Sequence, residues 1–377
     1  MSYVLGGALG VLSFSRKNGK LIFVLVISYA LIIFIFNKDN PDLFAYQEHF
    51  AGRLNDFSEP IYISGGMLFD ALGLNFWIYR AFLAVLGVYL ISGTIKKFSP
   101  YPAFNLFLYI LYPFIIDVVQ IRFFTGYAFV IYSIKYIIYY RNTKDKKNVF
   151  WFIISIIIGT GFHYSIIMYL VLLLLFFDIK KHKLFFYIVI PLFLIFTISN
   201  IDLLAPVMGM ILGESKTRSW ILREKNATLV NIIRILVTRS TILIIIYFFS
   251  LFKKNRGYIA ALSQPELLHK RSFFYDIETN AYLFLAVLYI DIFSLLELLV
   301  ASEYERMSRP ALIVGSILAC RQLYSMEKRN QIICSFILFA FVLLYFVGEM
   351  YFQDTYDQII YFEWVFRRVM ENNLLFR

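Results

Sequence analysis

The sequence predicts an all-α protein: a polytopic bundle of about 12 transmembrane helices, with interfacial or re-entrant helices on its outer side. Apolar residues make up 60% of the 377 residues, and 41 Phe and 28 Tyr are more than a water-facing surface could hide. Apolar runs recur along the chain, separated by short groups of Lys and Arg. Most of residues 1–377 are therefore expected to form a single integral membrane domain.

Helices that cross a bilayer need about 20 apolar residues, with about 17 to 25 as the working range. The apolar runs place the predicted spans at residues 1–15, 20–37, 76–95, 101–117, 121–140, 148–161, 164–178, 184–200, 229–252, 279–300, 310–325 and 331–351.

The net charge of +11 comes from short basic groups between these runs rather than from one basic face, so it does not indicate nucleic-acid binding. Short basic loops resist translocation and are expected in the cytoplasm. The basic groups are Arg16–Lys20, Lys96–Lys97, Arg141–Lys147, Lys180–Lys183, Lys253–Arg271 and Lys328–Arg329. Both termini and all the alternate loops then face the outside.

Three of these outer segments are longer than a turn. Residues 38–75 are half apolar and contain Gly65-Gly66, which is expected to break any continuous span, so we predict interfacial or re-entrant helices there. Residues 201–228 carry Lys and Arg on an otherwise outer loop, which suggests an anionic partner outside. The tail 352–377 combines aromatic and basic residues suited to the membrane interface.

Ionisable residues at the ends of spans are candidates for function. Arg122 follows Gln120 in a very short outer loop, and its planar fork suits a pyrophosphate; the alternative is an arginine that snorkels to the interface. His163 lies in the turn GTGFHYS, where it could donate to a phosphate or act as a general base. The alternative is a histidine satisfied by a neighbouring carbonyl.

A late charged segment has Glu303, Arg306 and Arg309 at a spacing of three, so these side chains could share one helical face. They are either a binding site for the leaving group of a reaction or a solvated, internally paired helix end.

A further set of polar residues lies in the first outer segment. Asp42 and Tyr46 would share a helical face, Arg53 follows, and Glu59 precedes Pro60, which can begin a helix. The carboxylates there could activate an acceptor hydroxyl or be helix-terminus charges.

Several established motifs are missing: the sequence contains no Walker A, Rossmann, HExxH or GxSxG motif. His49, His163, His182 and His269 have no metal-ligand spacing, and Cys320 and Cys334 fall inside apolar runs. We therefore predict neither a cofactor nor a metal.

The order of these segments resembles the EpsG-like, Wzy-type bacterial polysaccharide polymerases. The resemblance rests on RKNGK after the first span, then NPDLFAYQEHF, FSEPIYISGGMLFDALGLNFWIYR, SPYPAFNLFLYILYPFIIDVVQIRFFTGYAFVIYSIKYI, GFHYS and SEYERMSRP. It covers most of residues 1–175 and a short piece near 302–310. One departure is Arg122-Phe123-Phe124, where the family usually has Arg-Gln or Arg-x-Gly.

The resemblance implies an enzyme of the bacterial inner membrane that joins undecaprenyl-pyrophosphate-linked oligosaccharide repeat units into a surface polysaccharide (O-antigen, capsule or exopolysaccharide), with its active site outside. A GT-C-like glycosyltransferase architecture is implied as well, and the partners would be the lipid-linked repeat unit, the lipid bilayer, a chain-length regulator and a flippase. The implied site residues are Arg122, His163 and Arg306 for the leaving group, Glu59 or Asp42 for the acceptor, and Tyr46, Arg53, Tyr62, Gln120, Arg218, Arg223 and Arg309 for substrate binding.

Two other classes remain as alternatives. A flippase or transporter of a lipid-linked saccharide would favour inward-facing charges at several depths and related helix repeats, neither of which is evident. An O-antigen ligase or a membrane acyltransferase is the other enzyme to consider.

Overall fold

The computed structural model describes residues 2–13, 19–52, 59–178, 181–199, 241–251, 276–292, 306–351 and 362–375. These residues form helices and short connections, with no strand among them. The chain divides into two compact units: residues 1–135, 150–167 and 327–377 form the first, and residues 136–149 and 168–326 form the second.

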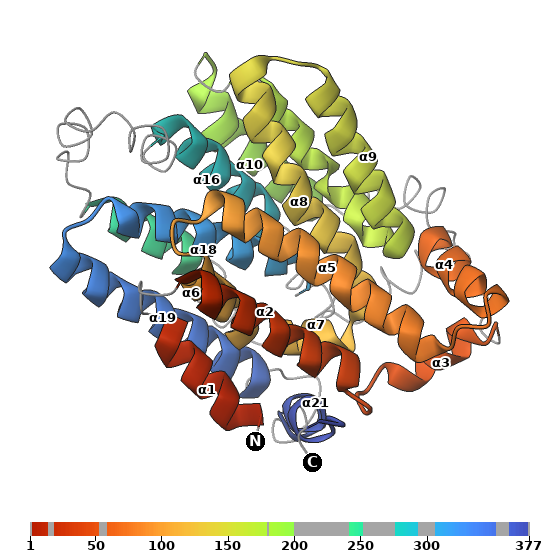
Figure 1. The fold of residues 1–377 in the computed structure, drawn as a ribbon. Coiled ribbons are helices and arrows are strands. Elements are labelled where there is room, and N and C mark those ends of the chain that lie inside the picture. Colours follow the sequence, from red (N-terminus) through yellow and green to blue (C-terminus); the bar gives the residue numbers. More distant parts are fainter. Residues whose placement is uncertain are drawn as a thin grey trace. The chain divides into compact units, whose positions relative to one another are not determined.

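The first unit contains most of the N-terminal helices and the C-terminal ones (Figure 1). Its helices are α1 (Ser2–Ser13), α2 (Gly19–Phe36), α3 (Leu43–Phe50), α4 (Pro60–Ala71), α5 (Phe76–Phe98), α6 (Pro102–Leu111), α7 (Phe114–Val119), most of α8 (Ile121–Thr143) and α9 (Lys147–Phe162), α19 (Lys328–Tyr351), the π-helix η5 (Phe362–Arg367) and α21 (Arg368–Glu371).

The second unit begins with the end of α8 and the start of α9. It also holds most of the 3-10 helix η1 (Tyr164–Phe176), the π-helix η2 (Phe185–Val189), α10 (Ile190–Ser199), the helix Thr241–Leu251, α16 (Ile277–Ile292) and α18 (Arg309–Tyr324). Within it α16 packs along α18, and Gly315 of α18 lets Ile242 come so close that an added Cβ would lie 2.6 Å from it.

Local sequence signals set several helix ends. Proline occupies the first turn of α4, α6 and α18, where its missing N–H costs no helical hydrogen bond. Asn75 caps α5 by accepting from the amide of Ile78 at 3.1 Å. Gly52 and Gly73 follow α3 and α4 with φ of +71° and +72°, a conformation that favours glycine.

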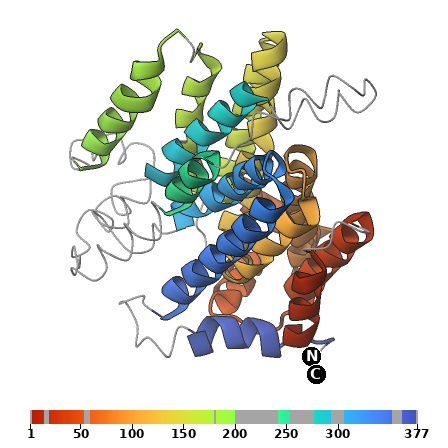
Figure 2. The same ribbon diagram turned by 90° about the vertical axis from the view of Figure 1, so that its left-hand side faces the viewer.

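One end of the first unit gathers segments that are far apart in the chain. Helix α2 packs against α5 and α6, and its last turn is followed by Asn37, whose carbonyl accepts a hydrogen bond from Arg80 of α5 at 2.8 Å. The starts of α4 and α8 meet at the same end through Glu59 and Arg122. Figures 1 and 2 show α1 and α21 side by side, so residues from both ends of the chain are also close here.

Four described helices are long and apolar enough to cross a bilayer: Gly19–Phe36, Phe76–Phe98, Ile121–Thr143 and Lys328–Gly348. Helices also form at most of the other predicted spans, but they have fewer than 18 described residues. The structure is thus that of a helical membrane protein, and the count of about 12 spans stays a prediction.

Two details of the sequence prediction were wrong. The predicted span 101–117 is two short helices, α6 and α7, because Pro113 cannot donate to a helix and keeps Tyr112 extended. The Gly65-Gly66 pair does not break its helix, since α4 runs through both residues. Instead, Gly65 makes room for Tyr79, whose hydroxyl would lie 2.8 Å from an added Cβ.

Candidate active site

The centre of the candidate site is an ion pair between Arg122 and Glu59. Arg122 lies in the first turn of α8, and Glu59 is the residue before Pro60 at the start of α4. The Arg122 Nη1 atom donates to Glu59 Oε2 at 2.6 Å, and the two side chains are 23% and 4% exposed. Glu59 makes no capping hydrogen bond to its own helix, so its carboxylate is directed to Arg122 rather than to the α4 terminus.

His163 reaches this pair because α8 and α9 approach closely. A Cβ added to Gly126 would lie 2.9 Å from the Gly159 carbonyl oxygen, and one added to Gly161 would lie 2.4 Å from Ile61. The end of α9 is thereby held against the start of α4, with His163 directly after it.

The histidine has polar and aromatic neighbours. Its Nε2 atom is 3.8 Å from Glu59 Oε1, an ion-pair distance when the ring is protonated, and its Nδ1 atom is 2.8 Å from Ser165 Oγ. Its ring is perpendicular to that of Phe123 at 5.2 Å between centroids and stacks on Tyr164 at 4.9 Å. The histidine is thus next to a serine hydroxyl and a carboxylate, and Phe123, part of the departure from the family motif, packs on it.

Two tyrosine rings flank the Arg122 guanidinium. The centroids of Tyr46 and Tyr62 lie 5.1 Å and 5.6 Å from Arg122 Cζ, distances typical of cation–π contacts. Tyr46 also donates to Asp42 Oδ2 at 3.3 Å. This confirms the prediction that Asp42 and Tyr46 share a helical face.

Both phenols are held in the protonated form. Burial, reinforced by the charge of Asp42, raises the pKa of Tyr46 well above its usual value. Burial also raises the pKa of Tyr62. The Tyr62 side chain is 2% exposed, and its hydroxyl has no hydrogen-bond partner among the residues that the structure describes. A buried hydroxyl without a partner is costly, so Tyr62 has a free donor for a ligand at this site.

The cluster combines groups that suit an anionic, hydroxyl-bearing substrate. Arg122 keeps its Nε–H without a hydrogen-bond partner in the described part of the chain, although it is paired with Glu59 through Nη1. Arginine cannot lose its proton near neutral pH and binds phosphate oxygens with two parallel hydrogen bonds. Glu59 supplies a carboxylate next to it, and no three His, Cys, Asp or Glu side chains in the described ranges are placed to hold a metal.

Six of the residues chosen from the sequence therefore meet in the first unit: Asp42, Tyr46, Glu59, Tyr62, Arg122 and His163. Gln120 lies next to Arg122 in the chain, as the C-cap residue between α7 and α8.

The other predicted residues lie in the second unit or outside the described residues. Arg306 and Arg309 lie in the second unit, where both act electrostatically on Tyr169, whose hydroxyl donates to the Met307 carbonyl at 2.6 Å. Arg53, Arg218, Arg223 and Glu303 lie outside the described residues.

Two buried charged residues near the site were missed by sequence reasoning. Arg80, 1% exposed, donates to the carbonyls of Asn37 and Val118 at 2.8 Å and 3.4 Å. Asp117, 0% exposed, accepts hydrogen bonds from the hydroxyls of Tyr109 and Tyr127. Both stand inside apolar runs, and a charge inside such a run is itself a signal of function or of a specific partner.

These features define a class of protein: a helical membrane protein with an arginine, a carboxylate and a histidine gathered at the ends of its helices. The chain belongs to the EpsG family, whose model matches residues 20–364. Family membership points to a glycosyltransferase-like function of the polysaccharide-polymerase type. No curated protein and no solved structure matches the chain.

Proposed function

We propose that this protein joins undecaprenyl-pyrophosphate-linked oligosaccharide repeat units into a surface polysaccharide on the outer side of the bacterial inner membrane. The observation that carries the proposal is the meeting of Glu59, Arg122 and His163 from three separate helices in a chain of the EpsG family. The donor is already activated by its pyrophosphate, so the reaction needs no nucleotide, in keeping with a sequence that has no nucleotide-binding motif.

The proposed step is a glycosyl transfer. The hydroxyl oxygen at the non-reducing end of the acceptor repeat unit forms a bond to the anomeric carbon of the donor glycan. The bond between that carbon and the phosphate oxygen breaks, and its electron pair leaves with undecaprenyl pyrophosphate. The acceptor proton passes to the Glu59 carboxylate.

Arg122 serves the leaving group in this proposal. The partly exposed guanidinium donates to the pyrophosphate oxygens on which negative charge develops, and Tyr62 can add its free hydroxyl. His163, in its protonated form, lies beside Glu59 and adds positive charge to the same place. Asp42 orients Tyr46 against Arg122 and is therefore assigned to positioning rather than to proton transfer.

For residues outside this cluster, the proposed roles are supported by the sequence resemblance alone. Arg306 is proposed to contribute to leaving-group stabilisation, and Gln120, Arg53, Arg218, Arg223 and Arg309 to substrate binding. We also propose partners of the enzyme: a flippase that delivers the lipid-linked units and a regulator that sets the length of the chain.

The test uses purified protein in lipid nanodiscs with a synthetic undecaprenyl-pyrophosphate-linked repeat unit, and product length is read on a gel. The wild type should form polymer, whereas Arg122→Ala and His163→Ala should leave single units. The loss of one oxyanion donor costs roughly a hundredfold or more in rate. Lys146→Ala, in an exposed loop, is the matched control and should polymerise normally. Repeat units that cross a sealed bilayer unchanged would instead identify a transporter.

A further inference from the structure

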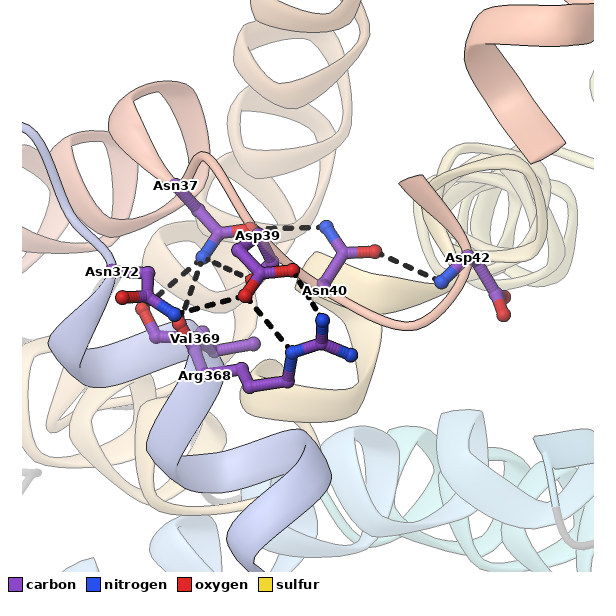
Figure 3. Close-up of polar contacts among 7 residues, drawn as sticks. All are labelled: Asn37, Asp39, Asn40, Asp42, Arg368, Val369 and Asn372. Carbon is purple, nitrogen blue, oxygen red and sulfur yellow. Dashed lines mark hydrogen bonds and ion pairs between the residues drawn. The ribbon is translucent and has the colours of Figure 1, made fainter. Parts of the chain in front are cut away.

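The residue after α2, Asn37, connects three parts of the first unit, and Figure 3 shows its contacts with the α2–α3 connection and α21. Its fully buried side chain donates through Nδ2 to the carbonyls of Asp39, Arg368 and Val369 at 3.0, 3.3 and 3.3 Å. Its Oδ1 accepts from Asn40 at 3.0 Å, and its main-chain carbonyl accepts from Arg80. One asparagine thus joins the α2–α3 connection to α5 and to the C-terminal helix α21.

A continuous path of contacts, most of them hydrogen bonds, leads from this asparagine to the candidate site. Asn40, 4% exposed, accepts through Oδ1 from the amide of Asp42 at 3.2 Å. Asp42 is the N-cap residue of α3 and accepts from Tyr46 through its carboxylate. The Tyr46 ring in turn lies 5.1 Å from Arg122 Cζ, a cation–π contact. The Arg122 guanidinium is therefore positioned through a chain of contacts that begins at α21.

The C-terminal segment is fixed to the same place by a second set of contacts. Arg368 binds the Asp39 carboxylate with both arms of its fork, Nε to Oδ2 at 2.9 Å and Nη2 to Oδ1 at 2.8 Å. Asn372 donates to Asp39 Oδ2 at 3.0 Å, and its carbonyl accepts from the Lys38 amide at 3.0 Å. Two-point binding by arginine fixes both the distance and the orientation of its partner.

We propose that Asn37 and Asn40 are positioning residues for Arg122, and that the C-terminal segment 368–373 is a built-in part of the candidate site. The expected effect on turnover rests on the proposed function, whereas the coupling between α21 and α3 does not.

The position of Arg122 depends on these contacts because α3 is short. This helix has eight residues, and its N-cap makes no side-chain capping bond. So short a helix has little stability of its own, and its place depends on what holds its first turn. The Asn40–Asp42 contact holds that turn, and Tyr46 lies one turn further on. A displacement of about 1 Å at a catalytic group can cost roughly a hundredfold in rate, so loosening α3 should be visible in turnover.

The experiment compares Asn40→Ala, Arg368→Ala and Arg368→Lys with Arg367→Ala as the matched control. Arg367, the last residue of η5, is the neighbour of Arg368, but it pairs with the exposed Glu371 at 2.8 Å. Hydrogen–deuterium exchange of the peptide that covers α3 is measured together with kcat and KM for elongation.

We expect faster exchange in α3 for Asn40→Ala and Arg368→Ala, with wild-type exchange for Arg367→Ala. Turnover should fall about tenfold while KM changes little, because the reacting groups are misplaced and the rest of the substrate contacts persist. Arg368→Lys keeps the charge without the fork, so it should lie between wild type and Arg368→Ala.

Two results would overturn the inference: equal exchange in α3 for all four variants and the wild type, or faster exchange with unchanged kcat. Should Arg368→Ala fail to fold, Arg368→Lys and Asn40→Ala still decide between these results. A wild-type protein that makes no polymer would refute the proposed function instead, and the exchange comparison would still test the coupling between α21 and α3.

Discussion

Removing one partner of the Arg122–Glu59 pair should destabilise the protein and abolish polymerisation by separable effects. The carboxylate of Glu59 is 4% exposed and has Arg122 at 2.6 Å, so Arg122→Ala leaves a buried negative charge without its main partner. Breaking a fully buried pair costs about 3–5 kcal/mol. Because Arg122 is 23% exposed and water can replace part of its contact, we expect about 2–3 kcal/mol here.

The double variant Glu59→Gln/Arg122→Gln separates the two effects. It removes both charges and keeps two polar side chains of similar length, so much of the lost stability should return. Its polymerising activity should remain absent, since neither a base nor a fixed positive charge is left.

A double-mutant cycle on unfolding in mixed micelles measures the coupling free energy of the pair, and gel analysis of the product measures polymer. A coupling below about 0.5 kcal/mol would refute the buried ion pair, because that value is within the range of exposed pairs. Normal polymer from the double variant would refute the assignment of the site.

Three further predictions follow from the fold and the sequence. Cysteine labelling in intact cells should reach residue 216 but not residue 144; the opposite result would overturn the predicted topology. Elongation by the purified protein should persist in chelator and without nucleotide, whereas restoration by magnesium would require Asp42 and Glu59 to be reassigned as metal ligands. Gly126→Ala should destabilise the protein by about 1–3 kcal/mol because its Cβ would lie 2.9 Å from the Gly159 carbonyl oxygen; Gly93→Ala, with open space around its Cβ, is the control and should be neutral or slightly stabilising in a thermal unfolding assay.

The parts of the site that lie close in the chain were predictable from the sequence. Asp42 and Tyr46 are four residues apart, which places them on one helical face, and Pro60 begins α4 directly after Glu59. These are local rules of helix geometry, and they need no knowledge of the tertiary fold. The helical membrane architecture was predictable for a similar reason, since apolar composition and basic loops are properties of the chain itself.

Pairings between distant segments were not predictable in the same way. Arg122 and Glu59 are 63 positions apart, and nothing in either segment specifies the other as its partner. Arg122 and Glu59 were predicted as candidates because each lies at a helix end. Their contact, in contrast, results from helix packing at Gly126 and Gly161.

Arg80 and Asn37 were missed for a different reason. Arg80 lies in an apolar run that predicted only a transmembrane helix. Asn37 follows another such run, where the sequence predicted only a loop. Their roles depend on main-chain carbonyls, which every residue has, so no side-chain pattern reveals them.

The contacts of Asn37 also set an order of assembly. Its side-chain amide binds carbonyls that lie 331 and 332 positions later in the chain. Helices enter a membrane in the order of synthesis, so α2 and α3 are in the bilayer long before Arg368 and Val369 leave the ribosome. Until then, the junction of α2 and α3 has buried donors without their final acceptors, and α3 is not held in place. The site would therefore be incomplete through most of synthesis, and we expect a chain cut before Arg368 to insert without the contacts that hold α3.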